Sequence, residues 1–216
     1  MPRRLDISDR SCQTPAFSAT SGERQTLDRA GTRSSGAWLA PERQESSTVS
    51  RYFVRPVRRD DIELLSEKFG DRHFLEDRLI RQTNGLGVLF TAWSGDVPAG
   101  LLYLWLEPAE EPEIAAALPE VALLTHLEVL PSLRSQGIGS ELMDHAERYL
   151  EARGHEQVAL AVHEDNTRAA ALYYRLGYRD WNAGKIVCYT YEVQPDGSVV
   201  REPEKCYVLV KYLNPA

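Results

Sequence analysis

One stretch of the chain, LEVLPSLRSQGIGS at residues 127–140, combines residue types that are suited to binding an anion. Arg134 offers a fixed positive charge, and Gly137 and Gly139 leave backbone N–H groups uncovered. An amphipathic helical pattern begins directly afterwards, so the positive end of a helix dipole lies at the same place. The sequence therefore predicts an anion site where a strand turns into a helix.

Two common phosphate-binding loops do not fit this stretch. A Walker loop requires a lysine directly after its second glycine, and no lysine follows Gly137 or Gly139. A dinucleotide-binding loop requires GxGxxG, and Leu142 stands where the third glycine would be. The loop is thus not assigned to either class by its glycines alone.

The elements expected around this loop alternate between strand and helix. Hydrophobic periodicity and capping signals predict a strand at 121–130, a helix at 138–152, a strand at 157–163 and a helix at 167–176. Before them we expect a strand at 51–56, a helix capped by Asp60 with Ile62, Leu65 and Phe69 on its core face, a helix at 74–83, strands at 86–93 and 97–106, and a loop with a short helical piece at 107–120. Strands at 186–194 and 198–212 follow, joined by a hairpin turn.

This order predicts the α/β (α+β) class, with a mixed, mostly antiparallel sheet of about seven strands and helices on both faces. We expect two regions. Residues 1–51 are rich in Ser, Thr and Arg and poor in aliphatic residues, which predicts a disordered tail; a transit peptide and a misassigned start are alternatives. Residues 52–216 form the folded domain.

Charge and composition limit the partners. The net charge is −7; residues 1–51 hold eight arginines and six acids, a surplus of +2, so the predicted domain carries −9. An acidic domain disfavours nucleic acid and favours cationic small molecules. No apolar run is long enough for a membrane helix and no secretory signal is visible, so we expect a cytoplasmic protein without a membrane partner. Cys188 and Cys206 are expected as reduced thiols within the sheet, and no residue pattern indicates a metal site.

A longer pattern identifies a family resemblance. The residues L-x-V-x-P-x-x-R-x-x-G-x-G at 127–139, followed by Asn166 and by ALYYRLGY at 171–178, resemble the GCN5-related N-acetyltransferase (GNAT) superfamily. The resemblance covers about residues 52–212, and its diagnostic motifs lie between 124 and 178. It implies a sheet whose fourth and fifth strands splay apart, and acetyl-CoA as the acyl donor.

The resemblance also implies roles for particular residues. The cofactor-binding residues would be Leu127, Glu128 and Val129, whose backbone pairs with the pantetheine arm; Arg134, Ser135, Gln136, Gly137, Ile138, Gly139 and Ser140, which surround the pyrophosphate; and Asn166 and Tyr173. Asn166 can equally be a simple helix N-cap. Tyr173 would be the catalytic residue, as the general acid for the departing thiolate, and Tyr174 is a rival about 100° further round the helix.

The general base is not settled by the sequence. Thr125 and Leu123 occupy positions where several relatives carry a carboxylate or imidazole, and neither can accept a proton at neutral pH. Strand alternation places His126 and Glu128 on the face opposite Thr125 and Leu127, which favours structural roles for both.

More distant positions offer further alternatives for the base. Ala161 stands at another family position for a glutamate, and His163, Glu164, Glu107 and Glu120 could act through a water. An acceptor amine of lowered pKa would need no strong base.

Together these observations predict an acetyl-CoA-dependent N-acetyltransferase that transfers acetyl to a primary amine by direct attack in a ternary complex. The acceptor would be a small-molecule or peptide amine, such as a polyamine, an aminoglycoside-like compound or a protein N-terminus. A homodimer is compatible with the sequence. The alternative is a non-catalytic acyl-CoA-binding regulatory module of the same fold.

Overall fold

The computed structural model describes residues 51–193 and 199–214. The predicted disordered tail, apart from its last residue, and the turn between the last two strands lie outside these residues. The strands are β1 Phe53–Pro56, β2 Gly87–Ser94, β3 Val97–Trp105, β4 Ala122–Val129, β5 Gln157–His163, β6 Arg179–Val193 and β7 Val199–Tyr212. The helices are α1 Ile62–Phe69, α2 Arg72–Thr83, α3 Pro112–Ala117, α4 Ile138–Glu151 and α5 Thr167–Arg175, with 3₁₀ turns at Arg59–Asp61 and Pro131–Leu133.

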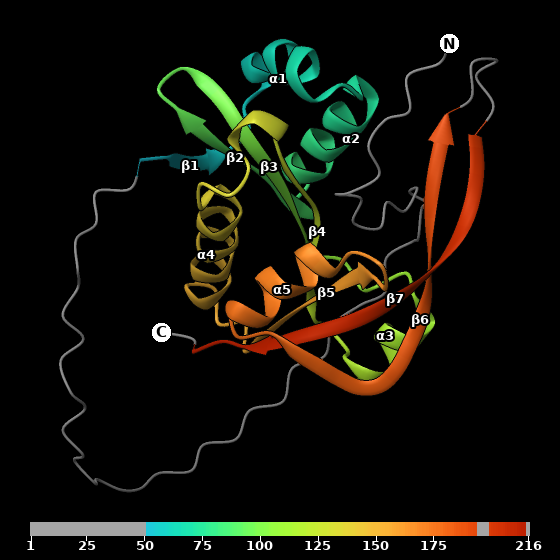
Figure 1. Ribbon diagram of the computed structural model, residues 1–216. Coiled ribbons are helices and arrows are strands. Elements are labelled where there is room, and N and C mark those ends of the chain that lie inside the picture. The colour runs from blue at the N-terminus through green and yellow to red at the C-terminus, as the bar shows by residue number, and fades with distance from the viewer. Residues whose placement is uncertain (1–50, 194–198, 215–216) are drawn as a thin grey trace, which may run out of the picture. The chain divides into compact units, whose positions relative to one another are not determined.

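The strands form one seven-stranded sheet in the order β1-β2-β3-β4-β5-β7-β6 (Figure 1). Neighbouring strands are antiparallel except β4 and β5, which are parallel and are connected through α4. The predicted mixed, mostly antiparallel sheet is therefore confirmed. None of the helices in the described part of the chain is both long enough and apolar enough to span a bilayer.

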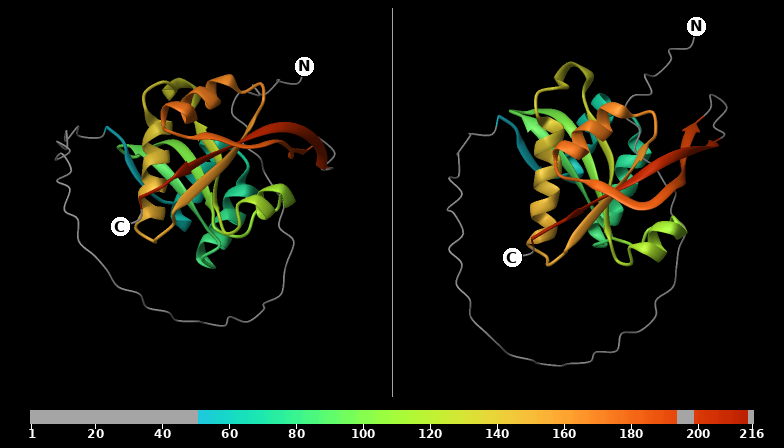
Figure 2. Two further views of the ribbon diagram at one scale, coloured as in Figure 1. Left: turned by 90° about the horizontal axis from the view of Figure 1, so that it is seen from below. Right: turned by 60° about the horizontal axis from the view of Figure 1, so that its bottom comes forward.

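Helices cover both faces of the sheet, as predicted (Figure 2). One face, which we call the α4 face, packs against α4 and α5 through residues such as Leu142, Ala146 and Tyr173. The other, the α2 face, packs against α1, α2 and α3 through Leu65, Leu75 and Ile114. The apolar stripes of these helices match the two sheet faces because buried strands present apolar side chains on both sides. Cys188 and Cys206 are buried thiols on the α2 face, which agrees with the sequence.

The β4–β5 pairing is short. Ala122 pairs with Val158 and Leu123 with Ala159, and the described pairing between the two strands ends there. Beyond this point β4 remains paired with β3, and β5 with β7. The C-terminal halves of β4 and β5 therefore splay apart, and the predicted gap between the fourth and fifth strands is present.

β6 begins earlier than predicted, at Arg179 rather than 186. Its first part is irregular, since the register with β7 shifts between Asp180 and Lys185. Asn182 and Gly184 both have positive φ, at 61° and 91°. Asparagine and glycine are typical of turns. The sequence RDWNAGK therefore did not predict that the strand continues here through a bulge.

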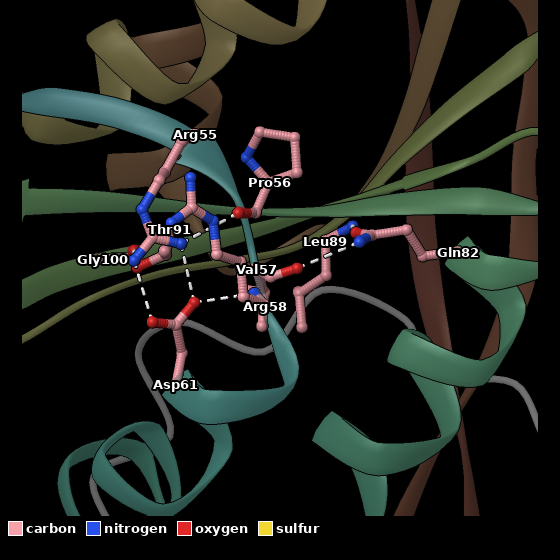
Figure 3. A network of polar contacts seen from close by, with 9 residues as sticks. All are labelled: Arg55, Pro56, Val57, Arg58, Asp61, Gln82, Leu89, Thr91 and Gly100. Atoms are coloured by element: carbon pink, nitrogen blue, oxygen red, sulfur yellow. Dashed lines mark hydrogen bonds and ion pairs between the residues drawn. The ribbon is translucent and has the colours of Figure 1, made fainter.

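Polar contacts join β1 to the 3₁₀ turn at Arg59–Asp61, and α2 to the end of β1 and to β2 (Figure 3). The Arg55 guanidinium donates to both carboxylate oxygens of Asp61, at 2.6 and 2.8 Å. The Gln82 side chain donates to the Val57 carbonyl and accepts from the Leu89 N–H, each at 3.0 Å. The hydrogen bond from Arg55 is the main cause that lowers the pKa of Asp61. Its stabilising effect is therefore present above the pKa of an unfolded aspartate and is lost as the pH falls through the lowered value.

Gly100 allows β3 to approach β4 closely. A Cβ at this position would lie 2.9 Å from the Glu128 carbonyl oxygen and 3.1 Å from Cγ2 of Ile138, at the start of α4. We expect Gly100→Ala to lower the free energy of unfolding by about 1–3 kcal/mol, because backbone and helix must both shift. Urea denaturation measures the change, with the exposed Ser94→Ala as a control within about 0.5 kcal/mol of wild type. A wild-type stability for Gly100→Ala would contradict the close approach.

Candidate active site

The loop between β4 and α4 has the conformation of an anion-binding turn. Pro131 opens a short 3₁₀ turn, and Arg134 is extended. Ser135 and Gly137 have left-handed backbones, with φ of 63° and 88°. Gly137 is the N-cap of α4 and offers no side-chain cap, so the first N–H groups of the helix stay available to a ligand. The backbone conformation of the loop is therefore compatible with the predicted anion site, which stays a prediction.

A pocket of about 400 Å³ lies between this loop, β4 and α5. Nine of the residues that the sequence assigns to the cofactor line it: Leu127, Val129, Arg134, Ser135, Gly137, Ile138, Gly139, Ser140 and Tyr173. The pocket extends to the splayed part of β4, so the loop and Tyr173 share one cavity. Its volume falls within the range of small-molecule and cofactor sites.

Three predicted cofactor residues, Glu128, Gln136 and Asn166, do not line the pocket. Gln136 accepts a hydrogen bond from the Tyr52 hydroxyl at 3.0 Å. Asn166 caps α5, with its side-chain oxygen accepting from the Ala169 N–H at 3.1 Å. The simple capping role considered for Asn166 is thus present in the structure, and the cap orients the helix that carries Tyr173.

Apart from Tyr173, sequence reasoning missed the residues of α5 that line this pocket. Arg168, Ala169, Ala171, Leu172 and Arg175 complete its lining. Their spacing at i, i+3, i+4 and i+7 places Arg168, Ala171, Leu172 and Arg175 on one helical face, which is a signal that the sequence contains. Arg168 also donates from Nη2 to the Ser135 hydroxyl at 3.3 Å, which connects α5 to the loop.

Tyr173 and Tyr174 have different environments. The Tyr173 side chain lines the pocket and only 6% of the residue is exposed, whereas Tyr174 is 44% exposed. The Tyr173 ring contacts Tyr178 edge-on, with centroids 6.1 Å apart. Tyr178 in turn donates to Glu147 of α4 at 2.9 Å, and burial is the main cause that raises the pKa of Tyr178. Tyr173 is therefore packed against a fixed ring and faces the cavity.

A β-bulge in β4 changes the faces of two titratable residues. Thr125 pairs with Tyr103 and Glu128 with Leu101, so a single residue of β3 lies opposite both His126 and Leu127. His126 has φ of 51°, in the left-handed region. Directly paired residues share a face, and Leu101 and Tyr103 both belong to the α2 face. Glu128 therefore lies on the same face as Thr125, and the prediction from simple alternation is wrong.

His126 and Glu128 form a pair on this face. The two side chains approach to 3.4 Å between Nε2 and Oε2, with 15% and 30% of their surfaces exposed. The His126 ring stacks on Phe74 of α2, with centroids 4.1 Å apart. Leu127 packs toward the opposite, α4 face and lines the pocket. The bulge thus places a carboxylate on one side of the splayed strand and the pocket on the other. The left-handed backbone of His126 is energetically costly for a non-glycine residue. Strain of this kind is often found at functional sites.

Buried aromatic and basic side chains hold α2, and with it Phe74, against the sheet. The Arg78 guanidinium lies 5.0 Å from the centre of the Phe74 ring and 4.8 Å from that of Tyr103. Arg81 lies over the Trp105 ring at 4.7 Å. Burial lowers the pKa of Arg78 and raises the pKa of Tyr103 to about 12. These cation–π contacts hold in place α2 and Phe74, on which the His126 ring stacks.

The other positions considered for the general base have other partners, are exposed or carry no titratable group. Glu107 forms an ion pair with Arg81, and Glu164 with Lys185. His163 accepts a hydrogen bond from the Asp165 N–H through Nδ1. Glu120 is an exposed residue in a turn before β4, and Ala161 carries no titratable group. Glu128 is therefore the carboxylate that the strand itself brings to the splayed region.

Comparison with known proteins agrees with this geometry. The model of the acetyltransferase (GNAT) family matches residues 51–178. A mycothiol acetyltransferase of Salinispora arenicola is 37% identical over 89 residues, which are 40% of this chain and 28% of that protein. The chain thus spans just over a quarter of the length of this curated relative.

Solved structures show the same fold at low sequence identity. The ribosomal-protein-S18-alanine N-acetyltransferase of Escherichia coli superposes with a TM-score of 0.55 at 17% identity, over 76% of this chain and 96% of that one. The spermidine N-acetyltransferase of Vibrio cholerae, solved with CoA and spermine, gives a TM-score of 0.55 at 14% identity over 76% and 97%. The chain belongs to the acetyltransferase (GNAT) family, whose members are N-acetyltransferases with acetyl-CoA as the acyl donor.

Proposed function

We propose that this protein transfers the acetyl group of acetyl-CoA to a primary amine by direct attack in a ternary complex. One observation carries the proposal: an anion-binding loop and a buried tyrosine share a single pocket beside a gap in the sheet, and a carboxylate lies on the other face of the same strand. The pocket would hold the donor, and the carboxylate face would receive the acceptor. The gap between β4 and β5 would let the two substrates meet.

The pocket residues fit the donor. The left-handed loop and the start of α4 would bind the pyrophosphate, with Arg134 adding charge. The backbone of Leu127 to Val129 has its β5 side open, because the pairing ends at Leu123. The amides of a pantetheine arm would pair with this edge as an added strand does. Acetyl-CoA supplies a thioester whose acyl carbon is open to attack by an amine.

Two side chains would donate and accept the protons of the reaction. In the reaction a C–N bond forms and the C–S bond breaks. Tyr173 would donate a proton to the departing sulfur, and Glu128, supported by His126, would take a proton from the acceptor nitrogen and pass it to water. This assignment replaces the structural role expected for Glu128 from strand alternation, because the bulge moves it to the acceptor face.

A base is worth several kilocalories per mole in this reaction. An alkyl amine with a pKa near 10.4 is neutral in about one molecule of 2,500 at pH 7, a deficit of roughly 4.6 kcal/mol. A carboxylate next to the attacking nitrogen can accept its proton as the C–N bond forms, which lowers the barrier to attack. The acceptor therefore need not be an amine of unusually low pKa.

The acceptor class follows from charge. The net charge of −7 favours cationic amines such as polyamines, aminoglycoside-like compounds or a free peptide N-terminus. The proteins of similar fold include enzymes described as acting on spermidine and on the alanine of a ribosomal protein, so the fold accommodates both small and peptide acceptors. A cytoplasmic location and a homodimeric assembly stay predictions from the sequence.

A thiol-release assay tests the proposal. The protein is incubated with acetyl-CoA and a panel of polyamines, aminoglycosides and peptides with free N-termini, and free CoA is measured with a thiol reagent. Mass spectrometry then identifies the acetylated amine. Tight acetyl-CoA binding in calorimetry together with no CoA release for any amine in the panel would contradict transfer and support the regulatory module instead.

A further inference from the structure

The donor pocket carries more positive charge than its loop needs. Three arginines line it, Arg134, Arg168 and Arg175, and its lining includes no acidic residue. This is unusual in a chain with a net charge of −7. Arg134 belongs to the loop, whose N–H groups already suit a diphosphate, and its Nε donates to the Val129 carbonyl at 3.1 Å. Arg168 and Arg175 both belong to α5 and form a second group of cations.

The two α5 arginines flank an apolar patch. They are separated by about two helical turns, roughly 10 Å along the axis, on the same face of α5. Ala171 and Leu172 lie between them on this face and also line the pocket. Leu172 in addition approaches the first turn of α4, since a Cβ on Gly139 would lie 3.4 Å from its Cδ2. A flat ring against the patch would have a cation at either side.

In the part of the chain that the structure describes, neither arginine has an acidic partner. Within residues 51–193 and 199–214, no carboxylate lies within ion-pair distance of Arg168 or Arg175. Other arginines on the helices do have acidic partners, as Arg72 pairs with Glu63 and Arg148 with Asp144. Uncompensated guanidinium groups in a concave site attract an anion, and they bind phosphate with paired N–H donors.

We propose that Arg168 and Arg175 bind the phosphate monoester on the ribose of CoA, and that Ala171 and Leu172 support the adenine. This inference rests on the proposed use of acetyl-CoA. The diphosphate occupies the loop, so the third phosphate of the donor needs cations of its own. A phosphate monoester carries close to two negative charges at neutral pH, which matches two arginines. The site therefore distinguishes CoA from dephospho-CoA, which lacks only this phosphate.

Isothermal titration calorimetry of the full chain with CoA and with dephospho-CoA tests the inference. We expect the wild type to bind CoA about 10- to 100-fold more tightly, the range for charge-assisted hydrogen bonds to a phosphate. In the double variant Arg168→Gln, Arg175→Gln this ratio falls to about one, because its affinity for CoA drops to that for dephospho-CoA. Arg148→Gln, which removes an exposed positive charge from α4, is the matched control and keeps the wild-type ratio.

The outcomes separate this inference from the proposed function. Equal binding of CoA and dephospho-CoA by the wild type would overturn the phosphate site and leave the acetyl-CoA pocket in place. The same holds if the double variant weakens both ligands by the same factor, since the arginines would then act on a shared part of the donor or on folding. Failure of the wild type to bind either compound would instead contradict the proposed function itself.

Discussion

Tyr173→Phe is expected to lower kcat by about a hundredfold, at the lower end of the range for loss of a general acid. The phenylalanine ring preserves the edge contact with Tyr178 and the packing at a residue that is 6% exposed. Only the hydroxyl that would protonate the departing sulfur is removed. Steady-state kinetics at saturating amine measure the change, and calorimetry should give the wild-type affinity for acetyl-CoA.

The neighbouring tyrosine provides the control for this result. Tyr174 is 44% exposed and is absent from the lining of the pocket, so Tyr174→Phe should change kcat less than twofold. The assignment of the general acid would be wrong if both variants kept wild-type kcat. If Tyr173→Phe instead lost acetyl-CoA binding and kcat together, the hydroxyl would have a structural role.

Glu128→Gln is expected to lower kcat/KM for an alkyl amine by at least a hundredfold at pH 7. Without the carboxylate, the variant depends on the neutral fraction of free amine, which rises from about 1 in 2,500 at pH 7 to about 1 in 25 at pH 9. Activity of the variant should therefore rise about tenfold per pH unit over this range, and the deficit against wild type should narrow. The pH profiles of kcat/KM for both proteins measure this effect.

The pH dependence separates a base from a residue that only shapes the strand. A structural defect would lower activity by the same factor at every pH. That result would contradict the proposal that Glu128 is the general base. Glu113→Gln, at an exposed position in α3, removes one carboxylate of the same kind and should retain the wild-type profile. Acetyl-CoA affinity of Glu128→Gln should remain unchanged, because Glu128 does not line the donor pocket.

The parts of the fold with local signals were predictable from the sequence. β5 has the predicted bounds, and α5 begins and ends within a residue of its prediction, because Asn166 and Gly177 mark its two ends. The anion loop was predictable for the same reason, since its glycines and the following helix are adjacent in the chain. The family resemblance indicated Tyr173 and left Tyr174 as a rival, and the burial of the two residues agrees with that prediction.

The parts that depend on pairing between distant strands were not predictable. The bulge at His126 arises because β4 must match the register of β3, and nothing in the residues THLEV marks it. One extra residue reverses the face of every side chain after it, so the predicted face of Glu128 relative to Thr125 was wrong. The sequence did not indicate that the α5 arginines line the pocket, because exposed arginines on a helix are common and this position depends on the loop that lies opposite in the folded chain.

The short β4–β5 pairing has a mechanical consequence. The sheet consists of two half-sheets, β1 to β4 and β5 to β7. In the described strands, backbone pairing joins them at Ala122–Val158 and Leu123–Ala159. Few backbone hydrogen bonds cross this junction, so the two half-sheets are held together largely by side-chain packing on both faces. A bound pantetheine arm would add hydrogen bonds across the open end and make the two halves one continuous, stiffer layer, so occupancy of the site would be coupled to the rigidity of the whole sheet.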